Sequence, residues 1–274
     1  MDRYTAASYK ASKLITTTYS TSFGLSIRLF AASLRPHIYA IYGFVRIADE
    51  IVDTYKGANQ RDLLNNLEAE IKQTLRSGYS TNPIIHAFAS TARQFAIDNT
   101  LITPFFESMR MDLVPQHFDQ KRYETYIYGS AEVVGLMCLK IFTNHTSLYD
   151  SLKTGAKHLG AAYQKINFLR DIAADAKGLG RWYFPIGSFE TFDKDAKNTI
   201  EKDIEHDLAL AAKAIAKLPS SSRKAVQLSY QYYRELLKII KQTSSASLKQ
   251  NRLRVNDLKK AALFLRNSLG RESD

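Results

Sequence analysis

The chain has 274 residues and a formal net charge of +11, with 45% apolar and 24% charged residues. These values are typical of a globular protein and allow one large domain or two small ones with a sizeable core. The single cysteine, Cys138, excludes a disulfide within the chain and, with only scattered histidines, a zinc site, so a reducing compartment is expected.

Helical periodicity runs along the whole chain and is interrupted by short stretches of turn and cap residues. No run of alternating strand residues, internal repeat or composition shift marks a second domain. We therefore expect a single all-α domain over residues 1–274, built from roughly eight to ten helices. The predicted breaks between helices are 76–83, 98–104, 114–120, 143–147, 177–188, 217–222 and 243–247.

A polar stripe follows one face of the helix predicted at 38–55. Tyr42, Arg46, Asp49 and Asp53 stand at i, i+4, i+7 and i+11, a spacing that aligns them beside an apolar stripe. The two carboxylates lie one turn apart, where like charges repel slightly. A cation, an ion-pair partner or plain exposure to solvent would account for them.

The most apolar run of the chain, residues 132–142, contains Cys138. It is too short for a membrane span and is bounded by charges, and the N-terminal residues lack a signal-peptide core. Cys138 is expected to be a small core residue rather than a nucleophile. We expect a cytoplasmic protein without a membrane span.

A second polar stripe has the same plan as the first. Gln164, Asn167, Asp171 and Asp175 stand at i, i+3, i+7 and i+11 of a predicted helix that is otherwise rich in apolar residues. Arg170 lies next to the first of these carboxylates. For one such stripe alone, an exposed face with local ion pairs is an equally good explanation, because two aspartates four apart are common.

The two stripes together favour a site. Two carboxylate pairs facing each other across a helical bundle would offer oxygen ligands to Mg²⁺ or Mn²⁺, and Mg²⁺ prefers one or two carboxylates, waters and substrate phosphates. Arginines suit the remaining phosphate oxygens. No EF-hand loop, phosphate-binding loop or dinucleotide fingerprint is present. We therefore predict a site that binds a diphosphate through Mg²⁺ and helps it leave.

Positive charge is concentrated near the end of the chain. Residues 223–271 contain 12 Lys/Arg and 2 Asp/Glu, so this region carries +10 of the net +11. A basic region indicates an anionic partner, although a solvated helix face is the simpler explanation for most basic helices. We predict weak peripheral association with an anionic membrane, such as the inner membrane surface, and no nucleic-acid partner.

Five motifs, in this order, resemble those of the squalene/phytoene synthase family. They are YSTSF (19–23), AIYGFVRIADEIVD (40–53), YGSAEVVGLM (128–137), QKINFLRDIAADAKGLGRWYFP (164–185) and RLRVNDLKKAALF (252–264). The resemblance covers most of the chain. It implies an all-α isoprenoid-synthase fold with a central apolar cavity and a Mg²⁺-dependent, head-to-head condensation of two allylic diphosphates.

The resemblance also implies roles for individual residues. The metal would be held by Asp49, Asp53, Asp171 and Asp175, with Asn167 as a further ligand. Diphosphate would be neutralised by Arg46, Arg170, Arg181 and Arg252. The substrates and their waters would be ordered by Ser20, Ser22, Tyr42, Gln164 and Tyr183. The cavity would be lined by Phe23, Ile27, Val133, Val134, Leu136 and Met137.

In the implied reaction, the donor ionises to an allylic cation, the acceptor double bond attacks it, and loss of a proton closes a cyclopropane that keeps one diphosphate. That group then leaves, the skeleton rearranges, and a second proton loss gives a conjugated triene. Such cations require an apolar cavity without water. Glu132 stands where the family often has glycine; it could take part in proton loss or pair with a basic residue.

Our first choice within the family is the phytoene type, which uses two geranylgeranyl diphosphates and no NADPH. A squalene or dehydrosqualene synthase that uses farnesyl diphosphate is the alternative. Two other classes are a non-catalytic helical assembly factor of the same fold, which would be expected to lose aspartates, and a basic nucleic-acid-binding module, which leaves both acidic stripes unexplained.

Overall fold

The computed structural model describes residues 1–114, 117–144 and 147–269, apart from the side chains of Ser22 and Leu269. These residues form helices and no strand, which confirms the predicted all-α class. The helices are α1 (Arg3–Tyr19), α2 (Thr21–Ile27), α3 (Arg35–Asp49), η1 (Glu50–Thr54), α4 (Gln60–Ser77), α5 (Pro83–Gln94), α6 (Asn99–Met111), α7 (Gln120–Ile127), η2 (Tyr128–Glu132), α8 (Val133–Thr143), α9 (Ser147–Leu179), α10 (Lys194–Ile215), α11 (Ser220–Gln242), α12 (Ser245–Leu248) and α13 (Asp257–Leu269).

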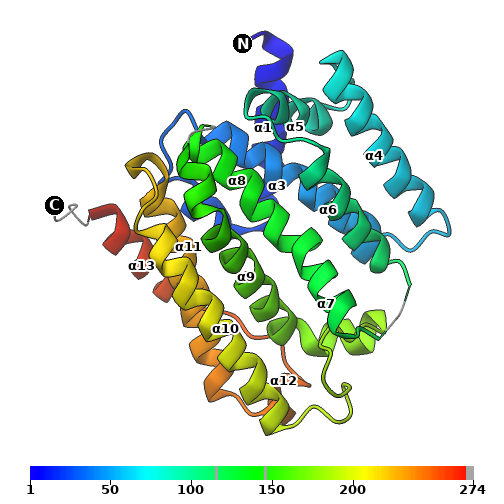
Figure 1. Cartoon of the computed structure of the whole chain (residues 1–274), viewed down its shortest axis with the longest axis vertical. Coiled ribbons are helices and arrows are strands. Elements are labelled where there is room, and N and C mark those ends of the chain that lie inside the picture. The colour runs from blue at the N-terminus through cyan, green and yellow to red at the C-terminus, as the bar shows by residue number, and fades with distance from the viewer. Residues whose placement is uncertain (115–116, 145–146, 270–274) are drawn as a thin grey trace.

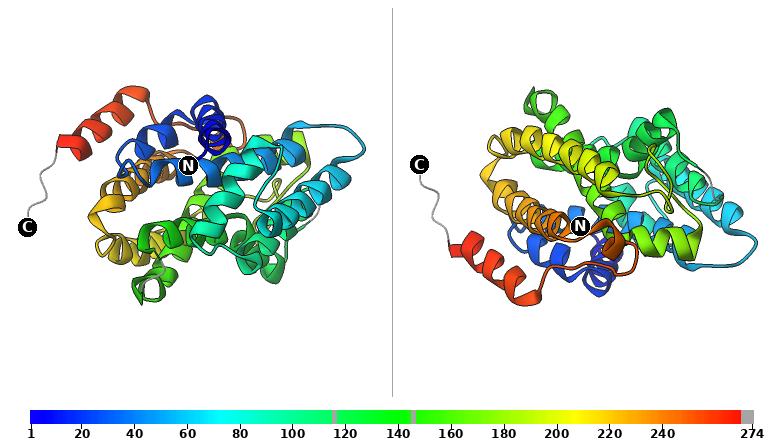
Figure 2. Two further views of the ribbon diagram at one scale, coloured as in Figure 1. Left: turned by 90° about the horizontal axis from the view of Figure 1, so that it is seen from above. Right: turned by 90° about the horizontal axis from the view of Figure 1, so that it is seen from below.

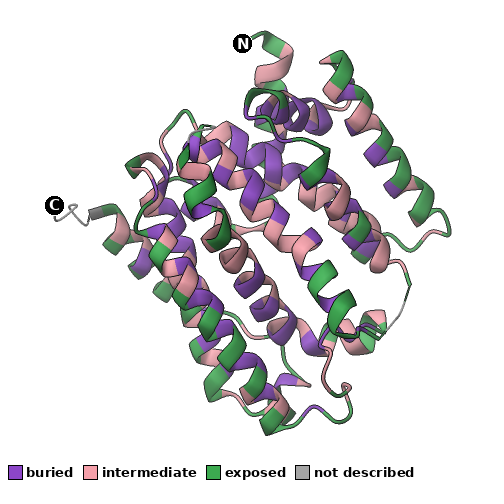
Figure 3. Ribbon diagram, in the orientation of Figure 1, coloured by how far each residue is buried: buried purple, intermediate pink, exposed green. Residues whose placement is uncertain are grey.

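The long helix α9 passes through the middle of the bundle (Figure 1). It packs against α8 and η2 on one side and against α10 and α11 on the other, while α1, α3 and α5 pack together at one end. Two large apolar clusters fill the interior, one centred on α3, α5, α6 and α8 and the other on α7, α9, α10 and α11. The inward faces of these helices are buried and their outer faces exposed (Figure 3).

The helix that contains the apolar run 132–142 is longer than that run. Helices α7, η2 and α8 join into one rod, Gln120–Thr143, which is the one helix of the described chain that could span a membrane by length and composition. Val133 and Met137 of this rod are fully buried in the first apolar cluster, so we assign it to the protein core. Burial also raises the pKa of Cys138 to about 12, as expected of an unreactive core thiol.

Two glycines let the rod approach its neighbours at backbone distance. A Cβ atom on Gly129 would lie 2.1 Å from the carbonyl oxygen of Pro104 in α6, and one on Gly160 would lie 2.6 Å from the carbonyl oxygen of Ala131 in η2. Both distances are far below van der Waals contact, so these positions require glycine. The close packing fixes η2 against α6 and α9.

One predicted break proved too long. Residues 98–104 were expected to separate two helices, but α6 begins at Asn99 and continues through Pro104. The side chain of Asp98 accepts a hydrogen bond from the Thr100 amide at 2.9 Å, which starts the helix ahead of the proline. Proline removes one backbone hydrogen bond, and the buried apolar face of α6 outweighs that loss.

Candidate active site

The first polar stripe lies on α3 and continues into a π turn. Tyr42, Arg46 and Asp49 lie on α3, and Asp53 lies in η1, where the amide of Tyr55 donates to the carbonyl of Glu50 at 2.9 Å. A π turn carries an extra residue, and such turns are frequent at functional sites. The regular helix expected from the sequence is therefore widened at the second carboxylate.

Asp49 is a half-buried carboxylate with no ion pair among the described residues. Burial, and then the charge of Asp53, raises the pKa of Asp49 to about 8 against the opposing effect of Arg46. Arg46 forms an ion pair with Glu50, and its guanidinium carbon lies 4.3 Å from the ring centroid of Tyr19. Its buried Nε has no hydrogen-bond partner, which leaves a donor for an anionic ligand.

Helix α2 contacts the start of this stripe. The Ser20 hydroxyl accepts from the Phe23 amide at 3.2 Å and also bonds to Tyr42, whose pKa is raised mainly by burial. The rings of Phe23 and Tyr42 are stacked with centroids 5.2 Å apart. The structure thus brings Ser20 and Tyr42 together, while their role in ordering substrates stays a prediction. The side chain of Ser22 lies outside the described residues.

The second stripe lies on α9, with Asp171 as its most strongly paired member. The Nη2 atom of Arg170 lies 2.6 Å from Oδ2 of Asp171, and Nε of Arg252 lies 2.7 Å from Oδ1. Arg252 lies on the segment between α12 and α13 and is 68% exposed. Asn167 accepts a hydrogen bond from the Tyr233 hydroxyl at 3.4 Å, and Gln164 is half-buried.

The ends of the two stripes face each other. Burial is the main cause that raises the pKa of Asp175 to about 7, and the charges of Asp171, Asp53 and Asp112 raise it further. Asp53 belongs to the first stripe and Asp171 to the second. Asp53 and Asp175, one from each stripe, therefore lie close enough for their charges to interact, whereas the meeting of all four carboxylates around one metal stays a prediction.

Arg181 joins the two stripes. Helix α9 ends at Leu179, Gly180 adopts a left-handed φ of 65°, and the Arg181 amide donates back to the carbonyl of Asp175 at 2.9 Å. This turn directs the Arg181 side chain inward, where it is 7% exposed. Its Nη1 donates to Asp53 at 2.6 Å and its Nη2 donates to the Val52 carbonyl at 2.9 Å.

Asp112 is a site residue that the sequence did not reveal. It follows the last residue of α6, and its side chain is 4% exposed. Its carboxylate accepts from the hydroxyls of Tyr126 at 2.6 Å and Tyr183 at 2.7 Å, and its main-chain carbonyl accepts from Arg181 at 2.7 Å. A lone aspartate at a predicted helix end is typical of an exposed cap, so no sequence signal marked it.

The oxygen donors present suit a metal ion that takes some of its ligands from the protein and the others from a substrate. No group of three or more His, Cys, Asp or Glu side chains in the described part of the chain converges on one point. Mg²⁺ seldom uses such a cage and instead takes one or two carboxylates, waters and phosphate oxygens. Burial, and then the charge of neighbouring carboxylates, raises the pKa of both Asp49 and Asp175, and a bound cation would relieve that repulsion.

The residues predicted to line a cavity belong to one apolar cluster. Ile27, Val133 and Met137 are fully buried, Leu136 is 6% exposed, and Phe23 and Val134 pack against them from the edge. They come from α2 and α8, and Phe23 stacks on Tyr42 of α3. A cavity among them stays a prediction.

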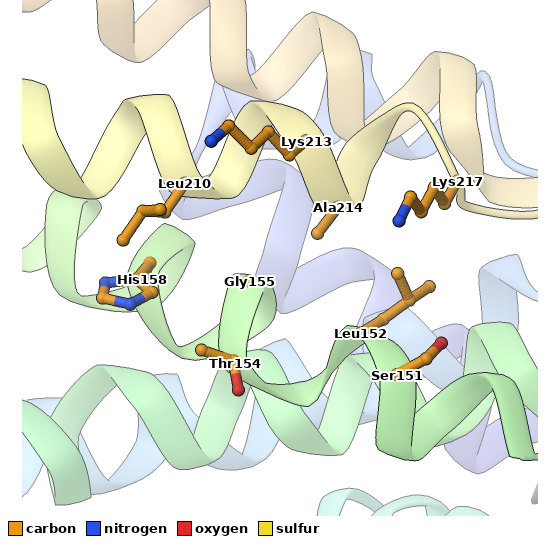
Figure 4. A pocket seen from close by; sticks show the side chains of 9 residues that line it. All are labelled: Ser151, Leu152, Thr154, Gly155, His158, Leu210, Lys213, Ala214 and Lys217. Atoms are coloured by element: carbon orange, nitrogen blue, oxygen red, sulfur yellow. The ribbon is translucent and has the colours of Figure 1, made fainter.

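A hollow of about 180 Å³ lies elsewhere, between α9 and α10 (Figure 4). It is lined by His158 and Leu152 from α9, by Lys213 from α10 and by Lys217 just after α10, and it contains none of the predicted site residues. A much smaller hollow of about 10 Å³ adjoins Asp175 and Arg181. Of the residues that line the smaller hollow, Asp175, Arg181 and Tyr183 belong to the predicted site.

Glu132 has a local partner. Its carboxylate pairs with Lys157 of α9 at 3.1 Å, and among the described residues no member of the two stripes forms an ion pair with it. Of the two roles considered for Glu132, the pairing with a basic residue is the one observed.

Comparison with known proteins gives consistent results. A family model described as squalene/phytoene synthase matches residues 16–259. The 4,4'-diapophytoene synthase of Staphylococcus haemolyticus is 30% identical over 192 residues, which cover 68% of this chain and 65% of that protein. This alignment spans slightly less than two thirds of the relative's length.

A longer alignment is found with the 15-cis-phytoene synthase of Synechococcus elongatus. It is 28% identical over 261 residues, covering 86% of this chain and 84% of that protein. Among solved structures, a dehydrosqualene synthase in complex with a ligand superposes with a TM-score of 0.84 at 22% identity and covers 96% of both chains.

Proposed function

The chain belongs to the squalene/phytoene synthase family, and on this premise we propose that it is a prenyltransferase that condenses two allylic diphosphates head to head. The observation that carries the proposal is that the buried Arg181 connects the two stripes, because its side chain donates to Asp53 and its amide donates to the carbonyl of Asp175. Asp53 and Asp171 are each paired with a guanidinium, while Asp49 and Asp175 carry raised pKa values. An assembly factor without catalysis would not need this costly arrangement.

The side chains would divide the work of ionising a diphosphate. Arg46, Arg170, Arg181 and Arg252 would bind phosphate oxygens, and Asp49, Asp53, Asp171, Asp175 and Asn167 would hold Mg²⁺. The metal would supply positive charge to the departing diphosphate. The apolar wall beside Tyr42 would keep water from the allylic cation. Breaking the carbon–oxygen bond then releases diphosphate, and the acceptor double bond forms the new carbon–carbon bond.

We propose geranylgeranyl diphosphate as the substrate and phytoene as the product, formed through a cyclopropyl diphosphate without NADPH. The relative from Synechococcus, named a 15-cis-phytoene synthase, supports this choice because it aligns with 86% of the chain. The relative from Staphylococcus, named a 4,4'-diapophytoene synthase, supports the alternative with farnesyl diphosphate.

Product analysis tests both choices. Purified protein is incubated with Mg²⁺ and either geranylgeranyl or farnesyl diphosphate, with and without NADPH, and the extracted hydrocarbons are identified by mass spectrometry. Phytoene is expected from geranylgeranyl diphosphate, at a rate that NADPH does not change. A product containing hydride from labelled NADPH would overturn the phytoene assignment, and no conversion of either substrate would overturn the enzymatic one.

The product of such a reaction is a hydrocarbon that must reach a bilayer, and α13 has a suitable face. Leu258 and Leu265 are 80% and 55% exposed, and the alanines at 261 and 262 between them are exposed too. This spacing makes one apolar stripe along the helix, with the exposed side chains of Lys259 and Arg266 along one edge. We propose that this stripe docks on an anionic membrane surface.

The position of α13 fits that role. The helix lies on the outside of the bundle against α11 and α2 (Figure 2). Its opposite face is anchored by Leu263, which is 9% exposed and packs with Leu228 and Tyr232 of α11. The outward stripe is therefore available without any loss of packing.

Sedimentation with liposomes tests the docking. The protein should sediment with anionic vesicles, not with neutral ones, and salt should release it. The double variant Leu258→Ser/Leu265→Ser should lose this binding, whereas Val114→Ser, which changes an exposed apolar residue elsewhere, should keep it. Equal binding by the double variant would show that the stripe is not the docking face.

A further inference from the structure

Asp112 is a buried carboxylate that belongs to neither stripe, yet it contacts two residues of the candidate site. Its Oδ1 accepts from the Tyr183 hydroxyl at 2.7 Å, and its Oδ2 accepts from the Tyr126 hydroxyl at 2.6 Å. Its main-chain carbonyl accepts from Nη2 of Arg181 at 2.7 Å. One residue thus holds both the guanidinium and the phenol that follow α9.

The direction of the Arg181 side chain depends on these contacts. Nη2 bonds to the carbonyls of Val52 and Asp112, and Nε lies 3.8 Å from Oδ1 of Asp112. Because a guanidinium is planar and presents its donors in a fixed fork, holding Nε and Nη2 determines where Nη1 points. Nη1 points at Oδ1 of Asp53, 2.6 Å away.

The aromatic residues around Asp112 fix Tyr183 in the same way. The rings of Tyr183 and Phe168 are stacked with centroids 4.2 Å apart and an angle of 9° between their planes. Stacking sets the plane of the Tyr183 ring, and the bond to Asp112 sets where its hydroxyl points. Nη1 of Arg181 lies 3.4 Å from this hydroxyl, so the two side chains are also in contact with each other.

The negative charge of Asp112 weakens the hold of Arg181 on Asp53. Arg181 is the shared cation of Asp53 and Asp112, with a side chain that is 7% exposed. If position 112 were neutral, Asp53 would be the only one of these two carboxylates left to attract Arg181. That carboxylate would then be less available to a metal, because a guanidinium and a divalent cation compete for the same oxygens.

We propose that Asp112 is a positioning residue of the active site, which orients Arg181 and Tyr183 and shares the charge of Arg181 so that Asp53 can bind Mg²⁺ and Arg181 can bind diphosphate. This inference rests on the proposed function, which gives Asp53 and Arg181 their roles. Asp112 acts only through these two side chains and the Tyr183 hydroxyl.

The substitution Asp112→Asn tests it, since asparagine keeps the shape and removes the charge. Calorimetry measures the binding of inorganic pyrophosphate in the presence of Mg²⁺, and kinetics measures the Mg²⁺ concentration for half-maximal activity. Loss of a residue that orients a ligand group typically costs about 10- to 100-fold in metal affinity or activity. We expect weakening of this size in both measurements.

Asp207→Asn is the matched control. Asp207 is also a buried carboxylate, 6% exposed, and it pairs with Lys165 at 2.7 Å and with His158 at 2.7 Å between α9 and α10, outside the site. This variant should lose stability but bind Mg²⁺ and pyrophosphate like the unchanged protein. If Asp112→Asn behaves in the same way, Asp112 is only a structural anchor and the inference is wrong.

A second pair of variants decides the question if Asp112→Asn does not fold. Tyr183→Phe removes the bond to Oδ1 next to Arg181, whereas Tyr126→Phe removes the bond to Oδ2 on the far side. The first should raise the half-saturating Mg²⁺ concentration several-fold more than the second, and equal effects would contradict the inference. Wild-type protein that binds Mg²⁺ and pyrophosphate but converts no prenyl diphosphate would refute the proposed function alone.

Discussion

Each of the two carboxylate stripes carries a pair of aspartates one turn apart, but the paired aspartates are neutralised in opposite ways. Asp53 of the first stripe is paired with Arg181, which is 7% exposed and bonded to main-chain carbonyls on both sides. Asp171 of the second stripe is paired with its neighbour Arg170 and with Arg252, which is 68% exposed and lies on a segment between two helices.

This difference separates structure from ligand binding. A buried cation with several partners is part of the fold, because removing it leaves other buried charges unpaired. An exposed ion pair contributes little to stability and can be exchanged for another partner at small cost. Under the proposed function, the first stripe is therefore held ready in advance, and in the second stripe Arg252 would move from Asp171 to an incoming diphosphate.

The largest expected effect is on activity. Asp49→Asn and Asp171→Asn should each lower the rate by about 100-fold or more, since each removes charge that stabilises the departing diphosphate. Only Asp171→Asn breaks ion pairs of the folded protein, so Asp49→Asn should be the more stable of the two. Steady-state kinetics and thermal unfolding provide the measurements.

The exposed carboxylate Asp62 of α4 supplies the control, and Asp62→Asn should keep both activity and stability. Full activity in either of the first two variants would remove the stripes from the catalytic site.

The next effect compares the two arginines. Arg181→Ala should lower the free energy of unfolding by about 3–5 kcal/mol, because it leaves Asp112 buried without its cation. Arg252→Ala should change it by less than about 1 kcal/mol, as for other exposed pairs. Denaturant unfolding gives both values. Similar losses in the two variants would mean that the stripes do not differ in the way described.

The pH dependence of stability distinguishes the stripes again. Asp49 has a pKa of about 8 in the folded protein and Asp175 one of about 7, both above the 3.8 of an ordinary aspartate. An acid with a raised pKa favours the folded state fully below about pH 4, and this contribution is lost as the pH rises through the folded value. In EDTA, stability should therefore fall from about pH 4 to about pH 8.

Single variants assign this slope. Asp49→Asn should remove the fall in stability between about pH 7 and pH 8, whereas Asp175→Asn should reduce the fall only below about pH 7. The melting temperature across the pH range measures both effects. Curves parallel to that of the unchanged protein would contradict the pKa values assigned to these carboxylates.

The smallest effect concerns a carboxylate outside both stripes. Glu132→Gln breaks only the pair with Lys157, whose side chain is 42% exposed, so stability should change by less than about 1 kcal/mol. Activity should stay near that of the unchanged protein. A large loss of rate with the fold intact would instead assign Glu132 a part in proton loss.

The sequence predicted what depends on local periodicity. The spacing of Asp49 and Asp53, and of Asp171 and Asp175, placed each pair on one helix face, and the turn residues separated most helices. Whether the pairs would meet depended on packing. That information comes from contacts such as Arg181 to Asp53, which are 128 positions apart in the chain.

Asp112 shows why the rest could not be predicted. Its burial results from Tyr126 and Tyr183, which come from two other segments, and neither is near it in sequence. The π turn at η1 was also missed, since the residues 50–54 read as ordinary helix. In both cases the residue pattern predicts a helix. Tertiary contacts determine where that helix is distorted and which of its residues are buried.

The contacts of Arg181 also determine when the site can form during synthesis. They reach back 69 positions to Asp112 and 128 positions to Asp53, so both carboxylates leave the ribosome long before their cation does. Until residue 181 has been made, η1 and the residue that follows α6 carry these carboxylates without their cation. Closing such long loops is slow and entropically costly, so the site is among the last parts of the nascent chain to become native.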